Sequence, residues 1–192
     1  SAEARFELSV DTKPIFERHF AECAGLGFIG RQSQLLSLEF GPWLFLSEII
    51  TNLELAPDAA APHKRSCGRC RRCVDACPTN AISETGAVDA RKCIAYLTIE
   101  HKDAIPHELR PKINDRIFGC DECLNVCPYT AKQKESKWTA LKAAAGFGGW
   151  LDLKRILNLK TQSEYEEYFK DTAILRAKRN QLLRNACIVL GN

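Results

Sequence analysis

The sequence predicts an α+β protein in three successive parts, because three kinds of pattern follow one another along its 192 residues. A mixed segment with one alternating strand pattern occupies residues 1–56. After a linker at residues 57–66, a segment dense in cysteine occupies residues 67–131. Helical spacing of apolar residues marks residues 132–192.

The composition places the chain among folded proteins without a membrane span. Hydrophobic residues make up 45% of the sequence, which is too apolar for a disordered chain. The longest apolar stretches are far shorter than the roughly 18 residues of a transmembrane helix. The N-terminus has no basic segment followed by an apolar one, so no signal peptide is expected. No methionine occurs, which suggests a processed or excised chain.

The first part predicts a strand followed by a helix. Apolar and polar residues alternate from Phe6 to Val10, as in a half-buried strand. Pro14 suits a first helical turn, Asp11 or Thr12 suits its N-cap, and Gly25 suits its end. The apolar residues at helical spacing are Ile15, Phe16, Phe20 and Cys23.

Residues 35–52 are largely apolar but broken by a Gly-Pro pair, which predicts two extended or partly helical pieces. Near the other end of the chain, helices are expected over Leu151–Leu157 and over Ile174–Leu190, the latter stopped by Gly191. A further helical face is expected from Trp138, Leu141 and Ala145.

The strongest signal is a CxxCxxCxxxCP motif, which runs from Cys67 to Pro78. This is the bacterial ferredoxin pattern, in which three thiolates bind one 4Fe-4S cluster and the fourth reaches a second cluster. A zinc site would need only four ligands and would leave cysteines unexplained. Without an export signal, a disulfide framework is also disfavoured.

A second half-motif, CxxCxxxCP, runs from Cys120 to Pro128 and lacks one inner cysteine, which Cys93 can replace. Exchange of the fourth ligands then predicts two complete clusters. The first set is Cys67, Cys70, Cys73 and Cys127, and the second set is Cys77, Cys93, Cys120 and Cys123. Full cysteine ligation leaves no open iron position, so these clusters are expected to carry electrons rather than to bind substrate.

The remaining candidates favour structural roles. Cys23 and Cys187 lie in apolar helical patterns and are expected to be buried. The segment Gly25–Gly30 matches GxGxxG, but a helix rather than a strand precedes it, so nicotinamide binding is disfavoured. Its glycines are expected to allow close approach, either of the chain itself or of a flat cofactor. The four histidines show no ligand spacing.

Several segments together resemble epoxyqueuosine reductase, a family related to the reductive dehalogenases. The resemblance covers nearly the whole chain, and its most specific parts are the Cys93 block and the two cluster motifs in this order. The matching segments are Val10–Thr12, Ala24–Gly30, Asp75–Ile82, Cys93–Lys102, Gly119–Cys123 and Leu183–Asn185.

The resemblance implies a cytoplasmic, cobalamin-dependent iron–sulfur enzyme that reduces epoxyqueuosine to queuosine at the wobble position of tRNA. Two 4Fe-4S clusters would pass electrons one at a time to cobalamin, and a flavodoxin or a ferredoxin-like protein would supply them. The fold would be the remnant of an α/β cobalamin-binding domain, a ferredoxin-like two-cluster domain and a helical segment leading to truncated repeats. Because much of the family's cobalamin domain is not seen, the chain is expected to bind cobalamin weakly or not at all.

The resemblance also assigns site residues. Asp11 matches the family's catalytic acid, which would protonate the oxygen as the epoxide opens; from the residues alone it suits a helix cap. Five residues match the region around the corrin and are candidate cofactor contacts, namely Gly27, Phe28, Ile29, Gly30 and Arg31.

The tRNA anticodon stem-loop has candidate contacts near the end of the chain. Five basic residues against one acidic residue lie in the segment 170–184, and phosphate contacts are electrostatic. The residues proposed to contact the RNA are Arg176, Lys178, Arg179 and Arg184; a solvated helix face is the other interpretation.

Two other functions remain open at this point. The cysteine segment alone also fits an electron-transfer module of another oxidoreductase, although residues 1–56 would then have no purpose. A respiratory reductive dehalogenase is the second alternative, although such enzymes are typically exported with a twin-arginine signal and none is visible.

Overall fold

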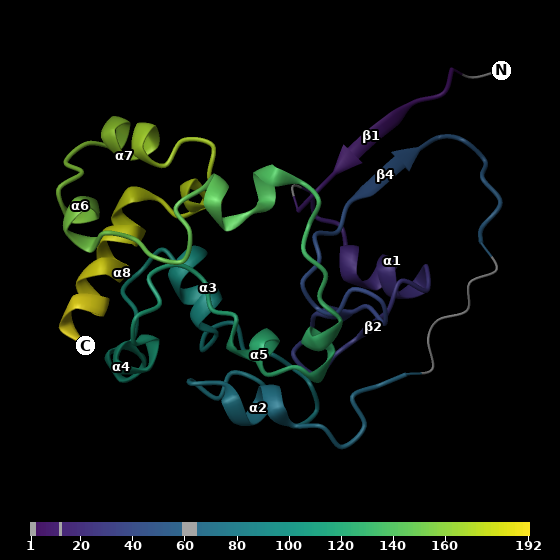
Figure 1. Ribbon diagram of the computed structural model, residues 1–192, viewed down its shortest axis with the longest axis horizontal. Helices are drawn as coiled ribbons and strands as arrows, with labels where there is room; N and C mark the ends of the chain where they lie inside the picture. Colours follow the sequence, from purple (N-terminus) through teal and green to yellow (C-terminus); the bar gives the residue numbers. More distant parts are fainter. Residues whose placement is uncertain (1–2, 12, 59–64) are drawn as a thin grey trace. The chain divides into compact units, whose positions relative to one another are not determined.

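The computed structural model describes residues 3–11, 13–58 and 65–192 (Figure 1). The contacts divide the chain into two compact units. The first unit comprises Ser1–Ala76, Glu84–Ala87 and Cys123–Lys134, and the second comprises Cys77–Ser83, Val88–Glu122 and Glu135–Asn192. The division thus falls within the cysteine-rich segment. The boundaries expected at residues 57–66 and 132 remain predictions, and most of the expected linker lies outside the described residues.

The first unit contains two small antiparallel sheets. Strand β1 (Phe6–Ser9) pairs with β4 (Glu48–Thr51), which lies beside it in Figure 1. Strand β2 (Phe28–Ile29) pairs with β3 (Leu35–Leu36). These strands confirm the strand expected from residue 6 and the extended pieces expected over residues 35–52.

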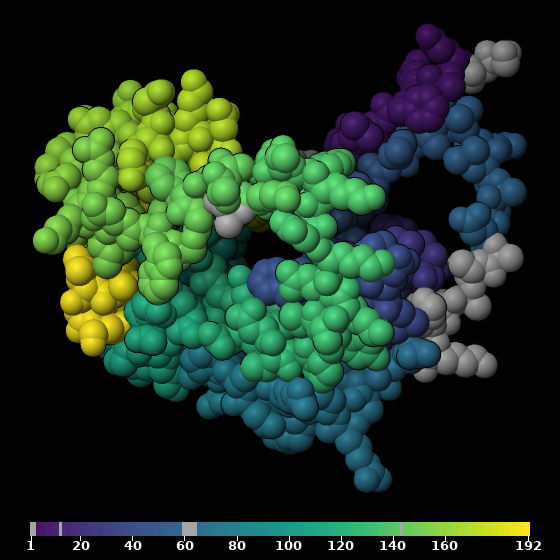
Figure 2. All heavy atoms as spheres, in the orientation of Figure 1, coloured from purple at the N-terminus to yellow at the C-terminus, as the bar shows by residue number. Residues whose placement is uncertain are grey.

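The faces of β1 do not follow the expected apolar-in arrangement. Ser9 is buried, whereas the Phe6 and Leu8 side chains are 63% and 72% exposed, and the purple β1 side chains stand at the surface in Figure 2. Ile49 on β4 is 67% exposed as well. Alternation therefore predicted the strand correctly but not which of its residues are buried.

Helix α1 (Glu17–Cys23) begins later than expected. Phe16 occupies the N-cap without a side-chain hydrogen bond, so Asp11 is not a helix cap and Pro14 lies before the first turn. Thr12, the other expected cap, lies outside the described residues. The helix ends as predicted, because Gly25 adopts a φ of 73° just after it.

The core of the first unit joins β2 and β3 to the segment after Cys127. Phe28 and Leu36 are 2% and 0% exposed, and the Phe28 ring meets Tyr129 edge-on at 5.4 Å between centroids. Gly41 lies against the same segment, since a Cβ there would stand 2.5 Å from the Tyr129 carbonyl oxygen. The fourth ligand of the first predicted cluster is therefore anchored to the N-terminal sheet.

The second unit is helical and holds two buried clusters of apolar side chains. One includes Ile94, Leu97 and Ile113, and the other includes Tyr165, Phe169 and Leu182. Its helices are α3 (Ile94–Ile99), α4 (Arg110–Ile113), α6 (Leu153–Leu157), α7 (Gln162–Tyr168) and α8 (Arg179–Gly191). Short 3-10 turns lie at His107–Leu109, Thr139–Leu141, Ala143–Ala145 and Ala173–Arg176.

The predictions for the C-terminal part are partly wrong. The helices expected near residues 151 and 190 are present as α6 and α8, although α8 starts at Arg179 rather than at Ile174. The expected face of Trp138 and Leu141 is absent, because these side chains are 73% and 49% exposed on short turns. No helix in the described ranges is long and apolar enough to cross a membrane.

Candidate metal centre and active-site pocket

The first cysteine motif folds as a turn that leads into a short helix. The Cys70 amide donates to the Cys67 carbonyl at 3.0 Å, and Gly68 between them adopts a φ of 54°. Helix α2 (Arg72–Ala76) then begins, which places Cys73 in its first turn with 7% exposure. The two-residue spacers therefore turn successive thiols toward the same side of the chain.

The four thiols of the first predicted set line one enclosed cavity of about 100 Å³. Burial raises the pKa of Cys73, and the nearby Cys67 raises it further. Burial likewise raises the pKa of Cys127, to which Cys67 and Cys70 also contribute. Cys67 and Cys70 thus act on both Cys73 and Cys127, so Cys127 lies close to these two cysteines although more than fifty residues of sequence separate it from Cys70.

Arg31 ties the start of this motif to the N-terminal sheet. Its backbone N–H donates to the Cys67 sulfur at 3.3 Å. Its guanidinium donates to the carbonyls of Gly68, at 3.1 Å, and of Glu84. An N–H donor aimed at sulfur suits a thiolate ligand, because such bonds stabilise negative charge on sulfur.

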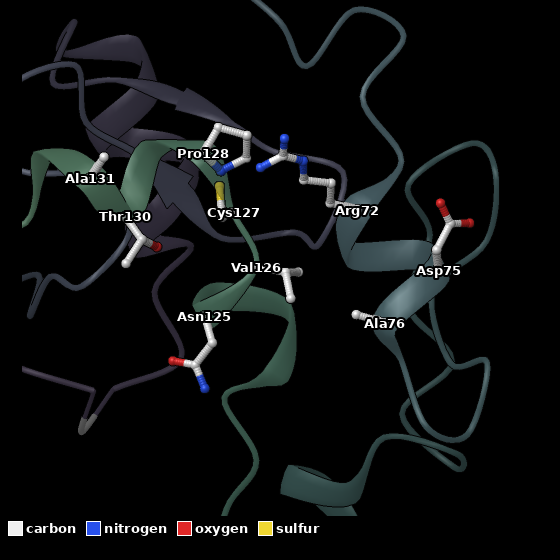
Figure 3. A pocket seen from close by; sticks show the side chains of 9 residues that line it. All are labelled: Arg72, Asp75, Ala76, Asn125, Val126, Cys127, Pro128, Thr130 and Ala131. Carbon is white, nitrogen blue, oxygen red and sulfur yellow. The ribbon is translucent and has the colours of Figure 1, made fainter.

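A wider hollow of about 940 Å³ lies on the other side of Cys127 (Figure 3). Its walls come from α2, with Arg72 and Asp75, and from the segment 125–131. Arg72, Cys127 and Pro128 line both this hollow and the enclosed cavity. Of the first set of thiols, Cys127 is therefore the one that borders both the shared cavity and the open hollow.

The second predicted set is built from short local structures. The Cys77 sulfur accepts a hydrogen bond from the Ala81 amide at 3.2 Å, and Cys93 is the N-cap residue of α3. Burial raises the pKa of Cys120, Arg116 opposes this shift, and Cys93 adds to it. Cys120 and Cys93 are therefore close enough to interact, while Cys123 falls in the first unit.

Side chains of α8 bind the carboxyl end of α3. Asn185 is fully buried, and its amide donates to the Thr98 and Ile117 carbonyls at 2.8 and 2.9 Å. Arg184 donates to the carbonyls of Leu97 and His101 at 2.7 and 2.8 Å. The Thr98 hydroxyl in turn accepts from the Gly119 amide at 3.0 Å. This network fixes α3, which starts beside Cys93, against the segment that leads to Cys120.

Three of the four basic residues proposed for RNA contacts have partners inside the second unit. Arg184 serves the network just described, and Arg179 donates to the Leu159 carbonyl at 2.8 Å. Arg176 pairs with Glu100 at 2.6 Å. Arg176 and Lys178 are exposed, so these two present their charge to solvent most directly.

Asp11 lies in an open pocket of about 820 Å³ that also holds Ile29 and Phe45. It adopts a left-handed φ of 50°, which aspartate tolerates better than most residues. Its backbone N–H donates to the Glu17 carboxylate at 2.7 Å. The exposed Phe45 ring, at 83%, gives the pocket an apolar wall.

Glu17, which lines the pocket, and Glu48, which interacts with Glu17, are carboxylates that the sequence did not single out. Glu17 lines the pocket, and the pKa of Glu48 is raised by burial and then by the charge of Glu17. Neither belongs to a motif, and their proximity depends on β4 pairing with β1. The sequence carried no local signal for this pair.

The glycine segment proposed to contact a corrin is packed mainly against the chain itself. A Cβ at Gly27 would stand 2.4 Å from the Leu36 carbonyl oxygen, and one at Gly30 would meet Gln32 and Leu36. Phe28 is buried against Tyr129, and Arg31 serves the cysteine motif. Ile29, which is 38% exposed, lines the Asp11 pocket.

The prediction that Cys23 and Cys187 are buried is wrong, since both are exposed. Each lies on the solvent side of its helix, and the Cys23 sulfur lies 3.7 Å from the His19 ring. Among the described residues, no three His, Cys, Asp or Glu side chains form a group that would hold a single metal ion. His63 lies outside the described residues.

Residues 66–130 match the family model of the 4Fe-4S double cluster binding domain. This match defines the class, a protein with a two-cluster iron–sulfur domain, and agrees with the two cysteine motifs. Around this domain, residues 1–56 and 132–192 show a more specific similarity to known proteins.

Several curated relatives, all named epoxyqueuosine reductase, match nearly the whole chain. The epoxyqueuosine reductase of Aliivibrio fischeri is 40% identical over 183 residues, which are 95% of this chain and 48% of that protein. The epoxyqueuosine reductase of Escherichia coli is 41% identical over 97% of this chain and 48% of its own length. The resemblance found in the sequence is therefore confirmed, and the chain spans about half the length of these relatives.

Solved structures agree. A crystal structure of epoxyqueuosine reductase with a tRNA-Tyr epoxyqueuosine-modified tRNA stem loop matches with a TM-score of 0.87 and 34% identity, over 97% of this chain and 48% of that one. The Bacillus subtilis epoxyqueuosine reductase, with an aspartate catalytic loop swung out of the active site, matches with a TM-score of 0.79 and 31% identity, over 99% and 49%.

Proposed function

We propose that this chain is the iron–sulfur half of an enzyme that reduces epoxyqueuosine to queuosine at the wobble position of tRNA. The observation that carries the proposal is the similarity to epoxyqueuosine reductases across both cysteine motifs and the flanking segments. An epoxide becomes an alkene by gaining an electron pair and releasing its oxygen as water, which consumes protons. The reaction therefore needs an electron supply and a proton donor.

The electron supply is assigned to the two sets of thiols. Cys67, Cys70, Cys73 and Cys127 would hold one 4Fe-4S cluster, and their shared cavity and the Arg31 N–H donor support this fit. Cys77, Cys93, Cys120 and Cys123 would hold the other, on the strength of their spacing. When bound, such clusters supply electrons one at a time. A flavodoxin or a ferredoxin-like protein is the proposed source of these electrons.

Cobalamin is proposed from the family resemblance, and the glycine segment fits it only in part. The approach faces of Gly27 and Gly30 are filled by Leu36 and Gln32, so these glycines do not present a bare surface to a corrin. Ile29 is the member of this segment that faces the Asp11 pocket. Any cobalamin contact from this segment is therefore assigned to Ile29.

Asp11 is the proposed proton donor. Its place in an open pocket supports this role, as does the aspartate catalytic loop of the Bacillus subtilis structure. A carboxyl group held beside the epoxide oxygen would give up its proton as negative charge develops there. The positive φ of Asp11 is tolerated equally by asparagine, so Asp11→Asn removes the acid without straining the backbone.

The test compares Asp11→Asn with Asp171→Asn, which alters an aspartate of the same left-handed conformation outside the pocket. Anaerobically reconstituted protein is incubated with reductant and an epoxyqueuosine-containing stem-loop, and queuosine is measured by mass spectrometry. The Asp11 variant is expected to keep its iron but lose about 100-fold or more of its activity, while the control keeps both. Full activity of Asp11→Asn would remove this residue from the reaction.

An electron-transfer module remains the second candidate, because the two cysteine sets alone would suffice for it. The Asp11 pocket argues against this function, since a relay has no use for an acid beside an apolar wall. The electron-transfer module would be favoured if the unaltered chain takes up both clusters and passes electrons to an artificial acceptor but never reduces the epoxide. Turnover of a halogenated substrate instead would favour a dehalogenase-like enzyme.

A further inference from the structure

Gln32 is a buried polar side chain without a hydrogen-bond partner for its amide nitrogen. It is 4% exposed, and its Nε2 donates to no group in the described part of the chain. Buried amides are almost always paired in folded proteins, so an unpaired one calls for a partner that is not a protein atom. The position of this amide shows what that partner would be.

Gln32 is one of the residues that line the cavity shared by Cys67, Cys70, Cys73 and Cys127. The preceding residue, Arg31, already aims its backbone N–H at the Cys67 sulfur. Two successive residues of one turn therefore border the same set of sulfurs, and the first of them already donates an N–H to one of these sulfurs.

Gly30 determines how the Gln32 amide lies. A Cβ at Gly30 would stand 2.5 Å from Gln32 Oε1, so the amide oxygen occupies the space that a side chain would fill. Leu36, which is fully buried, fills the rest of that space. The oxygen is thus held on the Gly30 side, and the amide is confined between this turn and the cavity.

We propose that Gln32 donates a hydrogen bond from Nε2 to a sulfur of the 4Fe-4S cluster held by the first set of thiols. The inference rests on the proposed function, because it needs a cluster on those four cysteines. An N–H···S bond stabilises the reduced, more negative cluster and so raises its reduction potential. Gln32 is therefore a tuning residue for one of the two clusters.

The test measures both midpoint potentials by electron paramagnetic resonance during a reductive titration of the reconstituted chain. Gln32→Met keeps the side-chain length but removes the donor, and one of the two midpoints is expected to fall while the other stays. A tenfold shift of the reduced-to-oxidised ratio corresponds to about 59 mV for a one-electron couple. Gln181→Met is the matched control, because Gln181 is a buried glutamine whose Nε2 bonds the Ile99 and His101 carbonyls. It is expected to leave the first cluster's midpoint in place.

Unchanged midpoints in Gln32→Met, with two clusters bound, would overturn the inference and leave the proposed function intact. A chain that takes up no cluster on the first set of thiols would overturn both. If Gln32→Met fails to fold, Gln32→Glu, which keeps the shape but exchanges the donor for a carboxylate, is expected to lower the same midpoint. In the unaltered protein, pulsed electron paramagnetic resonance in deuterated water is expected to show an exchangeable deuteron close to the cluster. The absence of such a deuteron would contradict the hydrogen bond.

Discussion

Replacing Asn185 with leucine is expected to weaken the second unit sharply. The change removes the amide that donates to the Thr98 and Ile117 carbonyls at 2.8 and 2.9 Å, in a site with no exposure. Each buried carbonyl left without a donor costs about 1–3 kcal/mol, so the free energy of unfolding is expected to fall by about 2–6 kcal/mol. Domains are stable by only about 5–15 kcal/mol, so this loss is a large fraction of the total.

Anaerobic guanidinium unfolding followed by far-ultraviolet circular dichroism measures this loss, with iron content as a second readout. Asn180→Leu is the matched control, because Asn180 is exposed on the same helix and its loss is expected to cost less than about 0.5 kcal/mol. Iron content is expected to fall with Asn185→Leu, since the network joins α3 to the segment before Cys120. A loss below about 1 kcal/mol with full iron content would refute the reasoning.

Three further outcomes are expected. Burial raises the pKa of Tyr165 to about 12. The neutral phenol therefore stabilises the fold below pH 10, and this contribution, up to about 3 kcal/mol, disappears as the pH rises toward 12. Unfolding midpoints measured between pH 9 and 12 test this, and the Tyr165→Phe variant should lose that pH dependence. Gly27→Ala is expected to cost about 1–3 kcal/mol because its Cβ would overlap the Leu36 carbonyl, whereas Gly149→Ala meets open space, and thermal melts that rank them otherwise would contradict this. Charge reversal at Arg176 and Lys178 is expected to weaken binding of the tRNA stem-loop. The slope of log binding constant against log salt concentration should become less steep by about 1 per lost phosphate contact, and an unchanged slope would exclude both residues from the interface.

Local patterns predicted those features that local chemistry determines. The alternation from Phe6 to Val10 predicted β1, and Gly25 was correctly expected to follow the end of α1. The cysteine spacings carried the most information, because a short spacer constrains where successive thiols can point. The shared cavity of the first set agrees with that prediction.

Features that depend on distant segments were not predictable in this way. Trp138 stands at helical spacing from Leu141, yet both are exposed, so periodicity alone produced no helix. Helix α7 was not predicted, although Thr161 and Glu164, which form its capping box, stand at the spacing that marks a helix start.

Site residues show the same limit. Arg184 looked like a surface cation, and only the carbonyls of α3, more than eighty residues upstream, make it an internal donor. Gln32 belongs to no motif, and its relation to the thiols depends on the turn after β2 and on the chain returning at Cys127. Whether Asp11 acts as the acid stays a prediction.

The capping of α3 by α8 has a consequence for biosynthesis. The donors from Gln181 and Asn185 reach carbonyls that were synthesised 80–87 residues earlier. Until Gln181 and Asn185 leave the ribosome, the carbonyls at the carboxyl end of α3 can accept hydrogen bonds only from water. Cys93 is then the N-cap of a helix that is not yet packed against α8. Stable iron insertion at the ligand proposed at Cys93 is therefore expected to follow release of residues 181–185, and a nascent polypeptide stalled before residue 181 would leave its thiols open to oxidation.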